Sequence, residues 1–316
     1  MKSIQTLFII GAGAHSQGHH GPAIAGLRHR LPRVYVIALD LASAESYRER
    51  FAFDDAFDSL EVALAHAKPD AVVAVTPESM TGKIFPTLLP LGVPLLMEKP
   101  FGETVEETAA LCELARGHHV MISLNRRFAP VIIKVREILA RRFAERRRYH
   151  IRSTMLRNRR FDNDFITATA IHLVDTTNFL GGGAAKVVTS QSWGKLDGVP
   201  AVSALLRFPD GVTGELFIAS RCGRLAETYE IFGENFQIVA NHISGEITVW
   251  DEGRVVETFS LDENMEPFRS QGSDVEFEAF LDAAESGSEF LARPEDALAA
   301  AKILRVLNDK FESDES

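Results

Sequence analysis

Apolar and polar positions in the first 124 residues alternate between short apolar runs and longer amphipathic stretches. The apolar runs have the length of buried strands, and the stretches between them have the length and period of helices. This alternation predicts a doubly wound sheet of parallel strands with helices packed on it. Strands are expected at 4–10, 34–39, 71–75, 93–97 and 120–124, and helices at 16–27, 59–67, 82–91 and 104–116.

From about residue 147 the chain shows single apolar positions alternating with polar ones. Turn sequences separate these runs, among them Pro209-Asp210-Gly211 and Asp251-Glu252-Gly253. Alternation with such turns predicts a largely antiparallel sheet. One helix is expected over about 165–180, and the second of two final helices begins near Pro294, a favourable first-turn proline.

The change of pattern indicates two domains, which also suits a length of 316 residues. We predict an α/β chain whose first domain, residues 1–124, holds the parallel sheet. The second domain, residues 125–316, is expected to be α+β with a large, mostly antiparallel open sheet. Its last helices can return to the first domain.

A glycine-rich turn follows the first predicted strand, which stops at the tripeptide GAG of residues 11–13. In a strand–turn–helix unit, Gly11 permits the tight turn and Gly13 lets the backbone approach a dinucleotide pyrophosphate at the helix N-terminus. The third glycine position of this fingerprint holds Ser16, which is small but weakens the match. We expect a Rossmann-type cofactor site that includes Gly11, Gly13, Ala14 and His15.

The second apolar run ends at Asp40. A carboxylate in this place accepts hydrogen bonds from the ribose hydroxyls of a dinucleotide and repels a 2′-phosphate, so Asp40 favours NAD over NADP. Approach of Arg28, Arg33 or Arg48 in the folded protein would weaken that preference. The alternative interpretation is that Asp40 simply begins the helix that follows it.

The strand at 93–97 runs directly into Glu98-Lys99-Pro100. Charged residues at the carboxyl end of a parallel strand lie where ligands bind in such sheets. Pro100 biases Lys99 toward an extended backbone, which holds the lysine at that edge. The alternative is a surface pair that only solubilises the strand end.

Composition and charge argue against several classes of protein. The formal net charge of −10 speaks against a nucleic-acid or membrane-surface role, and no apolar run reaches the length of a membrane span. We expect no signal peptide, since the N-terminus enters a strand directly. Cys112 and Cys222 have no metal or redox spacing, which suits packing residues in a reducing cytoplasm.

Residues 141–160 break the acidic balance, with nine arginines against the single acid Glu145. One interpretation is a solvated helix end followed by an edge strand. A second is that some of these arginines, Arg157 and Arg159 among them, bind a carboxylate or phosphate, since guanidinium forks suit such groups. Nucleic-acid binding comes third, because no stacking aromatic residues alternate with the arginines.

Six motifs occur in a specific order: GAG at 11–13, Asp40, VTP at 75–77, MEKPF at 97–101, NRRF at 125–128 and IHLVD at 171–175. With these motifs the chain resembles, over essentially its whole length, the Gfo/Idh/MocA family of nicotinamide-dependent oxidoreductases. The resemblance implies a Rossmann domain, NAD as cofactor and a sugar, polyol or related substrate. It also implies a homodimer or homotetramer formed through the open sheet of the second domain.

The resemblance assigns roles to individual residues. Lys99 is similar to the family's active-site lysine, and His172 to the histidine that acts as acid and base. A histidine can take the hydroxyl proton near neutral pH while hydride leaves, and a lysine stabilises negative charge that develops on the oxygen. Further cofactor contacts are expected at Thr76, Pro77, Glu98 and Asn125, and substrate contacts at Arg127, Arg157, Arg159 and Thr169.

Three histidines follow the glycine turn. His15 and His19 are four residues apart, a spacing that can bind a metal on a helix, and His20 comes next. The resemblance places His19 near the cofactor, so we expect no metal site.

One position departs from the family. An Asp usually stands four residues before the catalytic histidine, and here that position is Ala168, which cannot bond a sugar hydroxyl. Three functions therefore stay open: an oxidoreductase of a sugar, polyol or sugar acid, a catalytically silent dinucleotide-binding regulator, and a glycoside-cleaving enzyme with recycled NAD. The intact Lys99 and His172 favour the first and third over the second.

Overall fold

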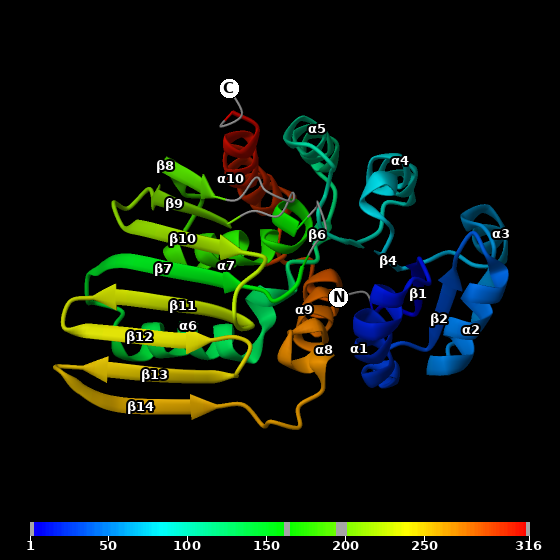
Figure 1. The fold of residues 1–316 in the computed structure, drawn as a ribbon. Helices are drawn as coiled ribbons and strands as arrows, with labels where there is room; N and C mark the ends of the chain where they lie inside the picture. The colour runs from blue at the N-terminus through cyan, green and yellow to red at the C-terminus, as the bar shows by residue number, and fades with distance from the viewer. Residues whose placement is uncertain (1–2, 161–164, 194–200, 314–316) are drawn as a thin grey trace. The chain divides into compact units, whose positions relative to one another are not determined.

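The computed structural model describes residues 3–160, 165–193 and 201–313, with side chains as far as residue 308. The chain forms two compact units (Figure 1). The first unit comprises Met1–Phe128 and Glu266–Leu298, and the second comprises Ala129–Met265 and Ala299–Ser316. Each unit is therefore built from two separate stretches of the chain.

Within the described residues, the first unit is built on six parallel strands in the order β3-β2-β1-β4-β5-β6. The strands are β1 (Thr6–Ile10), β2 (Arg33–Ile37), β3 (Asp55–Phe57), β4 (Ala71–Ala74), β5 (Leu95–Met97) and β6 (Val120–Ile122). Because parallel crossovers are right-handed, the reversal of order between β1 and β4 sends the helices on its two sides to opposite faces of the sheet. The predicted doubly wound sheet is confirmed.

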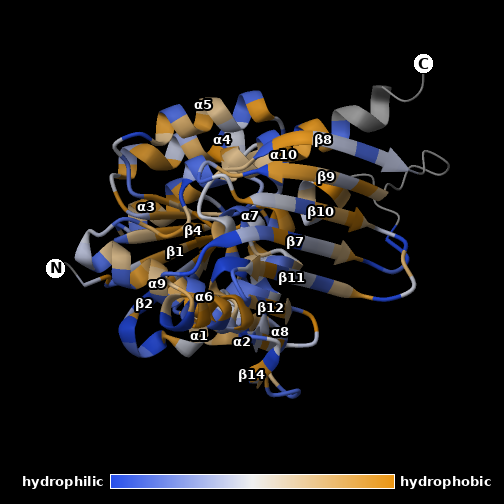
Figure 2. Ribbon diagram, turned by 90° about the vertical axis from the view of Figure 1, so that its left-hand side faces the viewer, coloured by the Kyte–Doolittle hydropathy of each residue, from blue (hydrophilic) through white to orange (hydrophobic). Residues whose placement is uncertain are grey.

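The helices of the first unit each bury part of their surface against the sheet or one another. They are α1 (Gly21–Gly26), α2 (Leu41–Phe51), α3 (Leu60–His66), α4 (Glu78–Leu88), α5 (Val105–Ala115), α8 (Pro267–Ser270) and α9 (Ser273–Ser286). The ribbon of α5 alternates between hydrophobic and hydrophilic colours in Figure 2. Phe277 and Phe280 of α9 are fully buried and belong to the same core as β1 and β4. This late helix therefore completes the core of the early sheet.

The predicted continuous helix over 16–27 is interrupted. Residues Ser16–His20 form a π-turn, η1, in which the Gly21 N–H donates to the Ser16 carbonyl, and α1 starts only at Gly21. Pro22 explains part of this, since a proline has no N–H to donate to the preceding turn of an α-helix. The other short turns in the described chain are η2 (Arg28–Arg30), η3 (Leu89–Leu91), η4 (Asn125–Phe128) and η5 (Phe165–Thr169).

The second unit is built, in its described part, on an eight-stranded sheet in the order β14-β13-β12-β11-β7-β10-β9-β8. Its strands are β7 (Arg148–Leu156), β8 (Lys186–Trp193), β9 (Ala201–Arg207), β10 (Thr213–Ala219), β11 (Ala226–Gly233), β12 (Phe236–Asn241), β13 (Glu246–Asp251) and β14 (Arg254–Ser260). All neighbours are antiparallel except β7 and β10. The predicted, mostly antiparallel sheet is confirmed.

One face of this sheet is covered and forms a second core. Helices α6 (Pro130–Arg142) and α7 (Ile171–Gly181) belong to the second unit, and α10 (Pro294–Ser313) begins in the first unit and ends in the second. Alternate residues of β7, such as Ile151 and Met155, are fully buried with Val131 and Val174 from the two helices. No helix in the described part of the chain is long and apolar enough to cross a membrane.

Gly181, the last residue of α7, offers a way to test how tightly this second core is packed. A Cβ there would lie 2.0 Å from Cε1 of Phe208, whose ring is only 2% exposed and has no room to move away. We expect Gly181→Ala to lower the free energy of unfolding by about 1–3 kcal/mol, as overpacked cores do. Chemical denaturation followed by circular dichroism measures the change.

Gly223 provides the matched control, because it lies in the same unit and a Cβ there would meet nothing within 4 Å. Gly223→Ala should change the free energy of unfolding by no more than about 0.5 kcal/mol. Equal denaturation midpoints for Gly181→Ala and the wild-type protein would contradict the packing described for α7.

Candidate functional site

The carboxyl ends of β1, β4 and β5 place several predicted site residues at one edge of the six-stranded sheet. Gly11 follows β1, Thr76 and Pro77 follow β4, and Glu98 and Lys99 follow β5. The strand order reverses between β1 and β4, and ligands of open α/β sheets bind outside the carboxyl ends of strands at such a point. This edge is therefore the candidate site in the first unit.

The two glycines of the turn are required for different reasons. Gly11 has φ +107°, and a Cβ there would lie 2.0 Å from the Val75 carbonyl oxygen, so the fold itself demands glycine. Gly13 is exposed, and a Cβ there would meet nothing within 4 Å. The protein alone gives no reason for glycine at Gly13, whereas close approach of a ligand to the backbone does.

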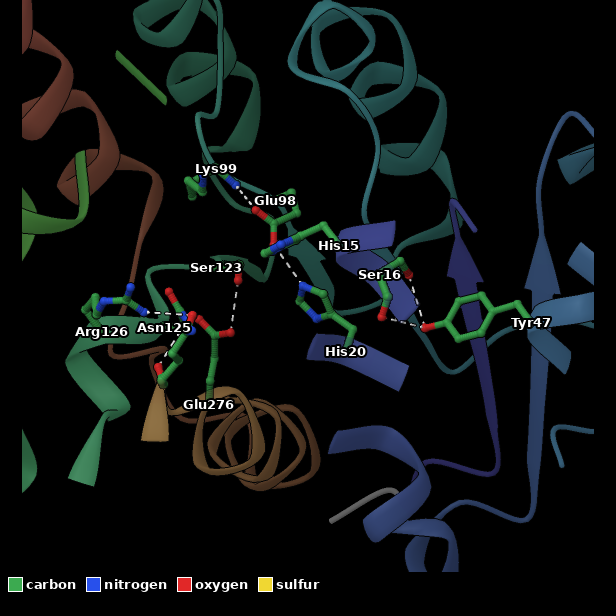
Figure 3. A network of polar contacts seen from close by, with 11 residues as sticks. His15, Ser16, His20, Tyr47, Glu98, Lys99, Ser123, Asn125, Arg126 and Glu276 are labelled. Carbon is green, nitrogen blue, oxygen red and sulfur yellow. Dashed lines mark hydrogen bonds and ion pairs between the residues drawn. The ribbon is translucent and has the colours of Figure 1, made fainter. Parts of the chain in front are cut away.

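Ser16, at the third position of the fingerprint, is hydrogen-bonded to Tyr47 of α2. Its hydroxyl donates to the Tyr47 oxygen over 3.1 Å, and the Tyr47 hydroxyl donates to the Ser16 carbonyl over 3.0 Å (Figure 3). Both side chains are fully buried. Close packing between α1 and α2 depends on Gly21, where a Cβ would lie 2.6 Å from the Phe51 ring and 2.9 Å from the Tyr47 ring.

Asp40 is the N-cap of α2, and its carboxylate is exposed. It accepts hydrogen bonds from the hydroxyl of Ser43 and, over 3.1 Å, from the Ser43 N–H. These bonds hold the pKa of Asp40 below its usual value, so the group is ionised near neutral pH. The structure therefore shows the helix-capping role that was the alternative interpretation of Asp40. The contact of Asp40 with a ribose stays a prediction.

Glu98 forms hydrogen bonds with three residues at this edge of the sheet. Its side chain is 5% exposed, and Oε1 lies 3.1 Å from Nε2 of His15 and 2.8 Å from Nε2 of His20 (Figure 3). Its other oxygen, Oε2, accepts the backbone N–H of Lys99 over 2.9 Å. The carboxylate thereby joins the turn after β1 to the residue after β5.

Burial alone would raise the pKa of Glu98, but hydrogen bonds from His15 and His20 and the charge of their rings hold that pKa well below its usual range. Glu98 is therefore a buried carboxylate ion. Burial and the nearby positive charges of His15, His20 and Arg126 lower the pKa of His19 to about 4, so its imidazole is neutral near pH 7.

Residues after β6 form the neighbouring wall of the site. The Asn125 amide donates to the Gln271 carbonyl over 3.1 Å, and Arg126 donates to the Gln271 side chain over 3.2 Å. Ser123 donates to the buried carboxylate of Glu276 on α9 over 2.9 Å. Figure 3 shows this group together with Lys99 and Glu98. Gln271, at the end of α8, thus supports the predicted cofactor residue Asn125, and α9 supports Ser123, both from a part of the chain that sequence reasoning did not connect to β6.

Two of the arginines predicted to bind substrate are engaged in structural contacts. Arg127 is buried in the first unit, where it donates to the Leu291 carbonyl over 2.7 Å and pairs with Asp296 over 3.2 Å. Arg157 is buried in the second unit and pairs with the fully buried Glu227 over 2.6 Å. These contacts favour a structural role for both residues over the predicted substrate role.

The remaining predicted residues lie in the second unit around η5 and α7. Arg159 is exposed and has φ +55°, and Thr169 of η5 accepts a hydrogen bond from Arg160 over 3.2 Å. His172 is the second residue of α7 and is partly exposed, and Ala168 lies in η5. The π-turn η5 interrupts the helix that was predicted over 165–180. Turns of this kind occur frequently at functional sites.

Sequence reasoning missed the partnership of His15 and His20 with Glu98. The histidines were judged by α-helical spacing, which pairs His15 with His19. The signal that was available is Pro22, which argues against a regular helix through residues 18–22.

Comparison with known proteins now adds to this geometry. Residues 6–126 match the family model described as the oxidoreductase family with an NAD-binding Rossmann fold, GFO_IDH_MocA. This segment belongs to the Gfo/Idh/MocA family. The resemblance inferred from the motif order is thereby confirmed, and the glycine turn, Asp40, Glu98 and Lys99 all lie inside the matched segment.

A curated member of this kind, inositol 2-dehydrogenase from Corynebacterium glutamicum, is 27% identical over 137 residues. The match covers 42% of this chain and 40% of that relative, less than half of either. Two solved structures match nearly end to end. A dehydrogenase from Chromobacterium violaceum has a TM-score of 0.85 at 20% identity, covering 98% of this chain and 95% of its own.

Levoglucosan dehydrogenase in complex with NADH has a TM-score of 0.83 at 17% identity, covering 98% of this chain and 97% of its own. At these identities the two structures show a shared fold, including the second unit that the family match does not reach.

The buried hydrogen bonds between Ser16 and Tyr47 predict how the stability of the protein changes at alkaline pH. Burial raises the pKa of Tyr47 well above that of a free phenol, against the opposing bond from Ser16 and the charge of Arg50. The contribution of the neutral phenol to stability is therefore complete below the unfolded-state pKa of about 10 and is lost as pH rises beyond it, by about 1.4 kcal/mol per pH unit.

We expect Tyr47→Phe to be less stable than wild type by about 1 kcal/mol at pH 7, through loss of the hydrogen bonds. The difference should shrink or reverse between pH 10 and about pH 11.5, since phenylalanine has no proton to lose. Denaturation at both pH values measures it. A constant difference across the range would show that the phenol is not held neutral by the fold.

Proposed function

We propose that this protein is an NAD-dependent oxidoreductase that transfers hydride between the nicotinamide and a secondary alcohol or ketone of a sugar, polyol or sugar acid. The single observation that carries the proposal is the edge formed by Gly13, Glu98 and Lys99. It combines a backbone open to a ligand with a buried carboxylate and a cationic side chain, at the switch point of a Gfo/Idh/MocA Rossmann sheet.

The residues present fit a dinucleotide. The open space at Gly13 admits a pyrophosphate, which backbone N–H groups at a helix start can bind. Asp40, ionised and exposed, suits ribose hydroxyls and opposes a 2′-phosphate, which supports NAD over NADP. Leu39 next to it is 92% exposed and offers an apolar surface to an adenine ring.

The chemistry proposed for the chain's own residues is proton transfer and charge stabilisation. When bound, NAD accepts the hydride that leaves the alcohol carbon. His172 would take the hydroxyl proton in the oxidation and return it in the reverse direction. Lys99 would stabilise negative charge that develops on a substrate oxygen. The match of each residue to its family motif supports its role.

A sugar-like substrate is supported by the relatives rather than by a pocket in this chain. The relatives include an inositol 2-dehydrogenase and a levoglucosan dehydrogenase, whose names refer to a polyol and an anhydrosugar. Arg127 and Arg157 form structural ion pairs. Of the three arginines predicted to bind substrate, the exposed Arg159 therefore best suits a substrate carboxylate.

Assembly through the sheet of the second unit is part of the proposal. Strand register places Trp193, Leu205 and Phe217 on the face opposite to buried Val202 and Leu206. Trp193 and Leu205 are 46% and 49% exposed. Exposed apolar side chains on a sheet face that also carries the Arg152–Glu215 ion pair suit contact with a second copy of the chain, as a homodimer or homotetramer.

A second function, a dinucleotide-binding regulator without turnover, is favoured by Ala168. This residue occupies the place of a substrate-binding carboxylate and has only a methyl side chain. The two functions share the cofactor site, so they differ in whether hydride transfer occurs.

The cofactor proposal predicts that Gly13→Val weakens NAD binding at least about tenfold, equal to about 1.4 kcal/mol, without lowering stability. The new Cβ meets no protein atom within 4 Å, and the valine side chain fills the approach to the backbone. Calorimetric titration with NAD measures the affinity. Gly26→Ala, also with open space around its Cβ, is the control and should bind NAD as wild type does. Wild-type affinity in Gly13→Val would contradict the cofactor site.

The catalytic proposal predicts that His172→Ala lowers turnover by a factor of about 10² or more, the usual contribution of a general acid and base. Lys99→Met should lower turnover as well, through loss of charge stabilisation. NADH appearance on a panel of polyols, sugars and sugar acids measures both. The exposed His118→Ala is the control and should retain turnover.

Undiminished turnover in His172→Ala would contradict the acid/base role. NAD binding by wild type with no turnover on any member of the panel would favour the regulator over the enzyme.

A further inference from the structure

Three potential metal-ligand atoms converge in the first unit. They are Nε2 of His15, Nε2 of His20 and Oε1 of Glu98, and all three lie within 4.8 Å of one another. His20 and Glu98 are buried, and His15 is half-exposed, so one side of the cluster opens to solvent. Figure 3 shows both imidazole rings directed at the same carboxylate.

The π-turn brings the two histidines together. Five residues of an α-helix rotate the chain by about 500°, which would leave His15 and His20 about 140° apart around the axis. A π-turn closes its hydrogen bond over five residues, as the bond from the Gly21 N–H to the Ser16 carbonyl shows, and so places residues five apart near one another. The cluster therefore depends on the local irregularity of η1.

The separations suit a small dication. Zinc binds imidazole nitrogen and carboxylate oxygen at about 2.0–2.2 Å, so neighbouring ligand atoms of a tetrahedral site lie about 3.4 Å apart. The two separations from Glu98 Oε1 are 3.1 and 2.8 Å, shorter than this spacing by about 0.3 and about 0.6 Å, and the two imidazole nitrogens lie within 4.8 Å of each other. Two histidines and one glutamate form a known zinc donor set that keeps a fourth position open.

We propose that His15, His20 and Glu98 form a binding site for a divalent transition-metal ion, of which Zn²⁺ is the best match. The sequence expectation of no metal considered His15 with His19, whereas the structure pairs His15 with His20 and adds a carboxylate. The half-exposed side of His15 is the entry path for the ion, and the fourth position is open to water or to an anionic ligand.

A backbone contact orients one ligand of the cluster. The Lys99 N–H holds Glu98 Oε2 in place and so orients Oε1 toward the two rings.

The test is zinc titration of the untagged, chelator-treated protein in the absence of any dinucleotide, so that its result does not depend on the proposed function. Isothermal calorimetry should show one Zn²⁺ per chain with a Kd in the micromolar range or below. Co²⁺ in place of zinc should give the strong visible absorption of a four-coordinate site. Absence of saturable binding of either ion would overturn the proposal.

Variants locate the ion. His15→Ala removes a half-exposed ligand, and Glu98→Gln removes the anion while preserving shape, so both are expected to fold, as circular dichroism will check. Each should weaken zinc binding at least about tenfold, the smallest effect seen even for residues that only support a ligand. His19→Ala, in the same turn but outside the ligand set, is the matched control and should retain wild-type affinity. Equal weakening in His19→Ala and His15→Ala, or none in Glu98→Gln, would overturn the assignment.

Discussion

The buried carboxylate of Glu98 is the interaction on which the arrangement of the candidate site depends. A carboxylate ion removed from water must be compensated, and here the compensation comes from His15, His20 and the Lys99 N–H. These three donors belong to segments that follow β1 and β5. A buried carboxylate without these donors would be strongly destabilising, so the three contacts hold the turn after β1 against the end of β5. They also fix the position of the Lys99 backbone.

Two irregular turns lie next to the residues that carry the proposed chemistry. The π-turn η1 follows the glycine turn, and the π-turn η5 precedes α7 and His172. Such turns are less favourable than regular helix and persist where side-chain contacts compensate for them. In η1 the compensation includes the bonds between Ser16 and Tyr47, together with those of Glu98.

The sheets could be predicted from the sequence because apolar period and turn residues are local signals. Strand β3 was outside the predicted ranges, since three residues are too few to show a period. The roles of Arg127 and Arg157 could not be read from the chain, because Asp296 and Glu227 are distant in sequence and only the fold brings them together. For the same reason the support of β6 by α9, through Ser123 and Glu276, had no signal in sequence spacing.

The close contact of Gly21 with Phe51 and Tyr47 bears on how nucleotide-binding fingerprints are recognised. The third glycine of the usual motif serves close packing of helix against sheet, and here a glycine five residues later packs closely instead, against α2. A fingerprint defined by fixed spacing undervalues such a sequence, whereas one defined by the contact that each glycine permits accepts Ser16 without loss.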